Sequence, residues 1–222
     1  MMTTADIAAP RQDPYHIGHG HGHGSLARGH GEGGPAPKRI IVGYGFWIFL
    51  LSDIVMFSAF FAAFAVLQGE TAGGPSGKDL FDLRITAIET GCLLISSFMC
   101  GMASLAAEAR RALWFHAAMA ATFVFGAAFI YLEVREFWVL VEQGAGPTRS
   151  AFLSAFFTLV GCHGLHVTAG LLWLLTMMAQ IFAKGFRPDI LRRYLCFSLF
   201  WHALDIIWVA LFTVVYLMGA GA

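Results

Sequence analysis

The sequence is poor in charge: only 13% of its 222 residues are Asp, Glu, Lys or Arg, where soluble domains average about a quarter. Its mean hydropathy is correspondingly high, at +0.68. The 14 basic and 14 acidic residues cancel, so no excess of positive charge suggests a nucleic-acid partner. This composition excludes an ordinary soluble domain and indicates a chain that is solvated by lipid.

Several patterns that mark self-sufficient enzymes and metal proteins are missing. No nucleophile motif, phosphate-binding loop or HExxH pattern is present, and the cysteines form no CxxC pair. We interpret the four cysteines as small buried apolar side chains: Cys92, Cys100, Cys162 and Cys196. No internal repeat is visible, which argues against the inverted-repeat architecture of many secondary transporters. We therefore do not expect this chain to be a catalyst by itself.

The sequence is instead rich in long apolar runs, and five of them are long enough to cross a bilayer. A hydrocarbon core of ~30 Å needs about twenty helical residues. In lipid every backbone polar group must be paired internally, which favours helices. The sequence therefore predicts an all-α membrane domain over residues 40–222 with five transmembrane helices. The predicted spans are Ile40–Leu67, Ile85–Ala107, Ala112–Leu132, Ser150–Phe182 and Tyr194–Met218.

The first 39 residues differ in kind, being rich in Gly, His, Pro and Ala without an apolar stretch. This composition argues against a cleavable signal peptide and predicts a disordered tail. Histidines interleaved with glycine can bind transition metals, with His19, His21 and His23 as weak candidate ligands. We prefer the simpler interpretation of a solvated tail that titrates near pH ~6.5.

The distribution of Lys and Arg predicts the orientation of the chain in the membrane, because cytoplasmic loops collect these residues. When the loops are numbered alternately, ten basic residues fall on the side of the N-terminus and four on the other side. We therefore expect a cytoplasmic N-terminus and a periplasmic C-terminus. Six of the ten lie in short loops: Arg110, Arg111, Lys184, Arg187, Arg192 and Arg193.

Ionisable residues within the predicted spans are the candidate functional residues, because a charge at a helix centre costs ~2.5–3.5 kcal/mol on insertion scales. Such groups face protein or water and find partners. We expect a buried polar network of six residues: Asp53, Glu89, His163, His166, His202 and Asp205. Glu133 and Glu136 form an acidic pair that closes the third predicted span at its outer end.

The histidines leave three interpretations open. A haem held by two histidines needs one ligand from each of two helices, and His163 or His166 with His202 satisfies that requirement in principle. A structural polar network or a lipid site is the second interpretation. A proton or ion pathway is the third. His202 and Asp205 are three residues apart on one helix, so they can also pair with each other.

Four segments together resemble subunit III of haem–copper terminal oxidases, and most closely the bo-type ubiquinol oxidases. HGLHV (163–167) and WHALDIIW (201–208) are specific in combination. The segments are GFWIFLLSDIVMFSAFFAAFAVL (45–67), ETGCLLISSFMCGMA (89–103), GPTRSAFLSAFFTLVGCHGLHVTAGLLWL (146–174) and SLFWHALDIIWVALFTVVYLMG (198–219). Subunit III of a cytochrome c oxidase is the alternative within the family. A haem b membrane anchor is the alternative from another class.

The resemblance implies an accessory, non-redox subunit in a bacterial inner membrane, with five helices and no cofactor of its own. The haems and copper belong to the partner subunit I, and subunits II and IV complete a complex that oxidises ubiquinol, reduces O₂ and pumps protons. Family members hold phospholipids in a V-shaped cleft, and we expect Arg110, Arg111 and Lys184 near headgroups. Asp53 occupies the position of a carbodiimide-reactive Glu of the mitochondrial relatives.

Overall fold

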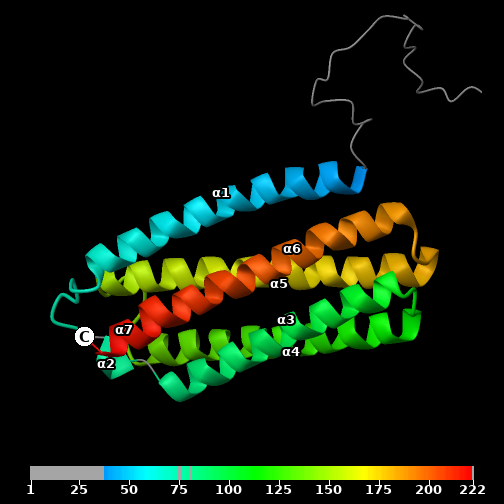
Figure 1. Ribbon diagram of the computed structural model, residues 1–222. Coiled ribbons are helices and arrows are strands. Elements are labelled where there is room, and N and C mark those ends of the chain that lie inside the picture. Colours follow the sequence, from blue (N-terminus) through cyan, green and yellow to red (C-terminus); the bar gives the residue numbers. More distant parts are fainter. Residues whose placement is uncertain (1–37, 75–76, 81, 222) are drawn as a thin grey trace, which may run out of the picture. The chain divides into compact units, whose positions relative to one another are not determined.

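The computed structural model describes residues 38–74, 77–80 and 82–221, and the regular structure of this part is entirely helical (Figure 1). Most of the predicted tail, 1–39, with its candidate metal ligands, therefore lies outside the described residues. The five long helices are α1 (Lys38–Leu67), α3 (Leu83–Glu108), α4 (Ala112–Glu142), α5 (Ala151–Lys184) and α6 (Pro188–Leu211). Short elements complete the chain: α2 (Gly77–Leu80), the π-helical η1 (Phe212–Leu217) and α7 (Met218–Gly221).

The prediction of an all-α membrane bundle is confirmed. Five helices of the described chain are long and apolar enough to cross a membrane, and the last of them continues through η1. Local sequence explains where they begin and end. The Asp82 and Ser150 side chains accept hydrogen bonds from the first turns of α3 and α5, and Pro188 begins α6. Gly185, at a φ of +70°, ends α5.

The end predicted for the third span is wrong, and the error moves the two acidic residues. The prediction stopped at Leu132, whereas α4 continues to Glu142. Residues 133–142 contain no Gly or Pro, and apolar residues continue among the acidic ones, so nothing breaks the helix before Gly144. Glu133 and Glu136 consequently lie inside the helix and not at its end.

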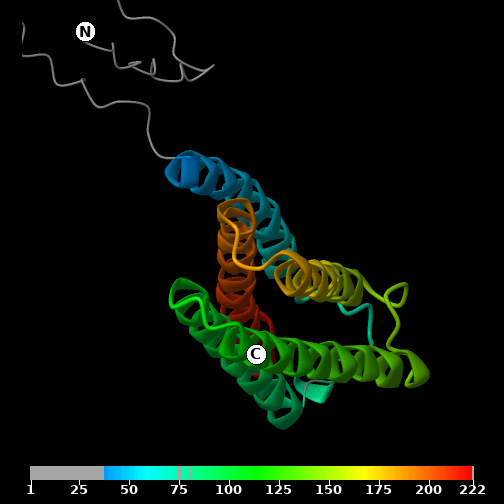
Figure 2. The ribbon, with the colours of Figure 1, turned by 90° about the vertical axis from the view of Figure 1, so that its right-hand side faces the viewer.

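The five long helices run in alternating directions, so the loops between them gather at two ends of the bundle (Figure 1). We call the end that carries residues 109–111 and 185–187 the basic end. Helix α6 packs against α1, α3 and α5, while α4 packs against α3 and α5. The end-on view shows α6 standing between α1 and the α3–α4 pair, with α5 alongside (Figure 2).

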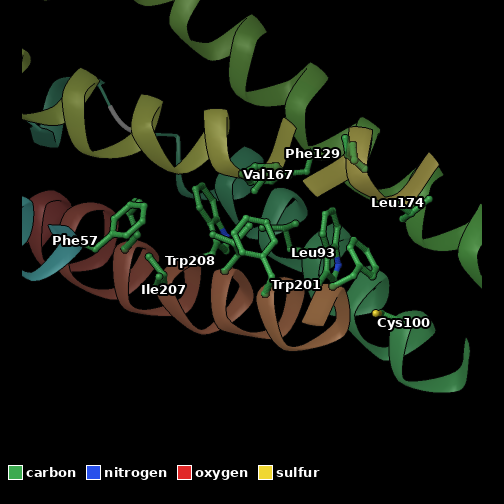
Figure 3. Close-up of a cluster of buried hydrophobic side chains, with 14 of the residues drawn as sticks. Phe57, Leu93, Cys100, Phe129, Val167, Leu174, Trp201, Ile207 and Trp208 are labelled. Carbon is green, nitrogen blue, oxygen red and sulfur yellow. The ribbon is translucent and has the colours of Figure 1, made fainter. Parts of the chain in front are cut away.

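The core is a layer of aromatic and aliphatic side chains between α6 and its neighbours (Figure 3). Trp201 is only 2% exposed and fills the space between two glycines on neighbouring helices. A Cβ atom on Gly170 of α5 would lie 2.8 Å from Trp201 Cζ3, and one on Gly126 of α4 would lie 3.1 Å from Trp201 Cη2. Small residues at these two positions let three helices approach around one large ring.

Candidate functional site

A ladder of hydrogen bonds joins α3 to α6 through the centre of the bundle. Trp201 Nε1 donates to Ser96 Oγ at 3.0 Å, and Trp208 Nε1 donates to Thr90 Oγ1 at 3.0 Å. The Ser96 hydroxyl in turn donates to the Thr122 carbonyl of α4 at 3.2 Å. We call this ladder the polar seam. Its members are Thr90, Ser96, Ser97, Ser104, Tyr194, Trp201, His202 and Trp208.

The seam continues toward the basic end through hydroxyl groups. Ser97 Oγ and His202 Nδ1 are 2.7 Å apart, and Tyr194 Oη donates to the Cys100 carbonyl at 3.0 Å. Ser104 Oγ lies 3.2 Å from the same Tyr194 hydroxyl. Each buried polar group of the seam therefore has a partner on another helix, which satisfies groups that lipid cannot.

A cluster of three carboxyl groups lies toward the other end of the bundle. Glu89 of α3 is fully buried, Glu133 of α4 is 3% exposed, and Glu136 is partly buried. They are close enough for their charges to interact. We call these three residues the carboxyl cluster.

The carboxyl cluster is incompletely satisfied. Neither carboxyl oxygen of Glu89 has a hydrogen-bond partner among the described residues, and neither does Oε2 of Glu133. Glu136 differs, because Oε2 accepts a hydrogen bond of 3.0 Å from the Tyr216 hydroxyl in η1. Buried oxygens without partners are costly, and they often indicate a functional group.

His163 and His166 differ in burial and in their hydrogen-bond partners. His163 is fully buried, and its Nε2 donates to the Leu204 carbonyl of α6 at 3.2 Å. Its ring lies 5.1 Å from Trp208 and 5.7 Å from Phe129, measured between centroids. His166 is half-buried, and its Nδ1 donates to the Cys162 carbonyl of its own helix at 2.7 Å.

The six predicted network residues form three groups in the structure. His202 and Asp205 lie beside Ser97, and Glu89 joins the carboxyl cluster. Asp53 is half-buried one turn before Phe57, whose ring contacts both His163 and His166. Within the described residues no hydrogen bond joins these three groups. His202 bonds to Ser97 instead of Asp205, whose Oδ1 has no partner there.

Sequence reasoning missed most of the seam and the tyrosine that contacts the carboxyl cluster. The overlooked residues are Thr90, Ser96, Ser97, Thr122, Tyr194, Trp201, Trp208 and Tyr216. Ser and Thr at helical spacing on one span, opposite Trp and Tyr on another, is a signal that points to interhelical hydrogen bonding. Each of these residues taken alone is common in a span.

The predicted headgroup residues gather at the basic end. Arg110 and Arg111 form the tight connection between α3 and α4, with Arg110 at a φ of +52°, and Lys184 is the last residue of α5. All three are exposed. In the described part of the chain, no group of three or more His, Cys, Asp or Glu residues is arranged to hold a metal ion.

Comparison with known proteins identifies the family. The model of the cytochrome c oxidase subunit III family matches residues 36–220. The chain belongs to this family. The sequence is 54% identical to cytochrome bo(3) ubiquinol oxidase subunit 3 of Pseudomonas aeruginosa, over 80% of this chain and 85% of the relative. It is 43% identical to quinol oxidase subunit 3 of Bacillus subtilis, over 80% and 87%. These relatives confirm the predicted resemblance to subunit III of the bo-type oxidases.

A cytochrome c oxidase relative is also similar. Subunit 3 of this oxidase from a Bacillus species is 41% identical over 79% of this chain and 84% of the relative. Relatives in the subunit III family are therefore named either for cytochrome c or for quinol, and the two quinol-named relatives described above are more similar to this chain than this cytochrome c oxidase relative.

Proposed function

We propose that this chain is the accessory, non-redox subunit III of a proton-pumping ubiquinol oxidase in a bacterial inner membrane. The observation that carries the proposal is the 54% identity to a ubiquinol oxidase subunit 3 across nearly the whole membrane domain. The complex would oxidise ubiquinol, reduce O₂ to water and move protons outward. The N-terminus would be cytoplasmic and the C-terminus periplasmic, as the excess of basic residues at one end favours.

The chain supplies no redox centre in this proposal, and the haems and copper belong to subunit I. The surroundings of His163 support this division of roles. Its Nε2, the atom that would ligate haem iron, is engaged by the Leu204 carbonyl, and aromatic rings enclose the imidazole. No observation favours the haem b anchor in the same way.

The chain stabilises subunit I, its main partner, with subunits II and IV completing the complex. Large apolar side chains exposed along α1 support an extended contact with protein or lipid, for example Val55 at 69% and Val66 at 78% exposure. The polar seam holds α3 and α6 together, and α6 packs against α1. The seam therefore supports the position of the exposed surface of α1.

Phospholipid at the basic end is a further part of the proposal. Arg110, Arg111 and Lys184 are exposed at one end of the bundle, where phosphate groups of a bilayer lie. Native mass spectrometry of the complex should find retained phospholipid, and it should fall when all three residues are changed to Gln. A complex that retains no lipid would contradict this part.

Support of proton uptake on the cytoplasmic side is the last part. The histidine-rich tail offers titratable groups there. Deleting residues 1–36 should lower turnover as the pH rises from ~6.5, where the histidines titrate, into the alkaline range. Identical pH profiles for the two complexes would remove the tail from the proposal.

The experiment that tests the main proposal is a mild-detergent purification through this chain. Optical spectra and mass spectrometry should show haems and a large subunit in the purified complex, together with ubiquinol oxidation. The chain expressed alone should show no Soret band. A Soret band in the isolated chain would instead favour the haem anchor, with His163, His166 and His202 as ligand candidates.

A further inference from the structure

A cavity of about 590 Å³ lies between α4 and α5, and Phe60 of α1 closes one side of it. Its walls are mainly apolar, and two glycines of α5 widen it, Gly161 and Gly164. Two lining side chains lie at the surface of the bundle, since Val134 is 59% exposed and Leu165 is 73% exposed. A molecule that diffuses within the bilayer can therefore enter this cavity from the side.

One lining group has unused hydrogen-bonding capacity. The hydroxyls of Thr158 and Thr168 donate to the carbonyls of Ser154 and Gly164 in their own helix. Glu133 differs, because its Oε2 is buried and has no hydrogen-bond partner among the described residues. The cavity thus combines an apolar body with a single buried acceptor, which is the usual composition of a small-molecule site.

Close contact with α5 fixes the position of this carboxyl group. A Cβ atom on Gly164 would lie 2.6 Å from Glu133 Oε1 and 2.8 Å from Oε2, so any other residue at this position would require the carboxyl group to move. The carboxyl group therefore lies directly against the backbone of α5, in the space left by the missing side chain of Gly164.

The depth of Glu133 restricts what can bind there. Helix α4 has 31 residues, or about 46 Å, and a hydrocarbon core of ~30 Å centred on it leaves about 8 Å of helix outside each face. Glu133 lies nine residues before the end of the helix, which is about 13 Å. With the core centred on α4 in this way, Glu133 lies about 5 Å inside the hydrocarbon, below the level of charged headgroups.

We propose that this cavity binds the ring of a quinol, with a phenolic hydroxyl donating to Glu133. A quinol is uncharged, so it can lie at this depth, and its two hydroxyls are donors for the unpartnered oxygen of Glu133. Phe60, Phe137 and Phe157 provide aromatic contacts for the ring, and the apolar tail leaves past Val134 and Leu165. The choice of a quinol rests on the proposed oxidase function, which brings this class of molecule to the complex.

The test is photolabelling of the intact complex in lipid nanodiscs with an azido-ubiquinol kept reduced under anaerobic conditions. We expect label on peptides of α4 and α5 that line the cavity, and competition by decylubiquinol but not by added phosphatidylethanolamine or phosphatidylglycerol. Label found only on other subunits would overturn the proposal. Equal competition by phospholipid would make the cavity a phospholipid site instead.

Two variants of the chain test separately how much the carboxyl group and the space around it contribute to quinol binding. Glu133→Leu should lower labelling about tenfold, because the hydrogen bond to the carboxyl group is lost. Gly161→Leu fills the cavity without contacting Glu133 and should lower it as strongly. Glu142→Leu is the matched control, since Glu142 lies on the same helix, bonds to Trp138 and does not line this cavity, and labelling of this variant should stay within about twofold.

Unchanged labelling in either Glu133→Leu or Gly161→Leu would overturn the proposal, so a single variant that assembles is enough for the test. Quinol oxidation by the wild-type complex distinguishes a failure of this site from a failure of the proposed function. A complex that oxidises quinol but carries no label on this chain contradicts the site alone, whereas a complex without quinol oxidation contradicts the function as well.

Discussion

Buried polar groups are hydrogen-bonded in the polar seam, whereas oxygens of the carboxyl cluster lack partners among the described residues. In the polar seam, each Trp, Tyr or His of α6 meets a hydroxyl or carbonyl of α3, as in the bond from Trp201 to Ser96. In the carboxyl cluster, Glu89 and Glu133 keep oxygens without partners among the described residues. Satisfied groups stabilise a helix interface, whereas unsatisfied ones cost stability, and some of them mark functional sites. We infer that the seam is structural and the cluster is functional.

The largest loss of stability is expected for Trp201→Ala in the polar seam. The variant removes a fully packed ring and its hydrogen bond, so we expect a loss of about 3–5 kcal/mol of stability. Denaturant titration of the purified subunit in mixed micelles measures it. Trp114→Ala is the matched control, because Trp114 is 64% exposed, and it should change stability by less than about 0.5 kcal/mol. Similar losses in the two variants would contradict the structural role of the seam.

The next largest effect is expected where the carboxyl cluster touches α5. Gly164→Ala places a methyl group against the Glu133 carboxyl and should cost about 1–3 kcal/mol by overpacking. Gly161→Ala is the control, since its nearest neighbour would be Phe137 Cε2 at an ordinary 3.5 Å.

A double variant identifies the cause of that loss. Combining Gly164→Ala with Glu133→Ala should recover most of the stability lost through Gly164→Ala, because the clash disappears. Strictly additive losses in the same denaturant titration would mean that the carboxyl group does not rest on Gly164.

A smaller effect of opposite sign is expected inside the cluster. Glu89→Leu replaces an unpaired buried carboxyl with an apolar side chain, so stability should be unchanged or rise by about 1 kcal/mol. Thermal unfolding of the complex, followed with its turnover, measures both consequences. Lower turnover at unchanged stability supports a functional cluster, and a clear loss of stability would assign Glu89 to structure instead.

The smallest expected effect is Ser97→Ala, which removes the partner of His202 from the seam. Interhelical hydrogen bonds in membranes average about 0.6 kcal/mol, so the loss should be of this order. Ser52→Ala is the control, because the exposed Ser52 bonds only within its own helix turn. Equal effects in thermal unfolding would show that the seam bonds contribute nothing specific.

The sequence predicted well what depends on local apolarity. Long apolar runs located all five spans, and the family motifs at 163–167 and 201–208 identified the subunit. The end of α4 was misplaced because Glu133 looked like the edge of an apolar run, although helix formers continue to Glu142. Neighbouring helices bury the Glu133 carboxyl group in the bundle. A short stretch of sequence around Glu133 does not include those helices, so it cannot show the burial.

Composition and periodicity by themselves determined that this chain is a five-helix membrane bundle, because the cost of unpaired backbone groups in lipid leaves no other solution for such runs. Only the tertiary structure decided which polar residues meet. Ser96 acquires its role from Trp201, which is 105 residues away, and Glu133 acquires its position from Gly164. Such pairs depend on the rotation and depth of each helix against its neighbours, which are fixed by side-chain packing between segments distant in sequence.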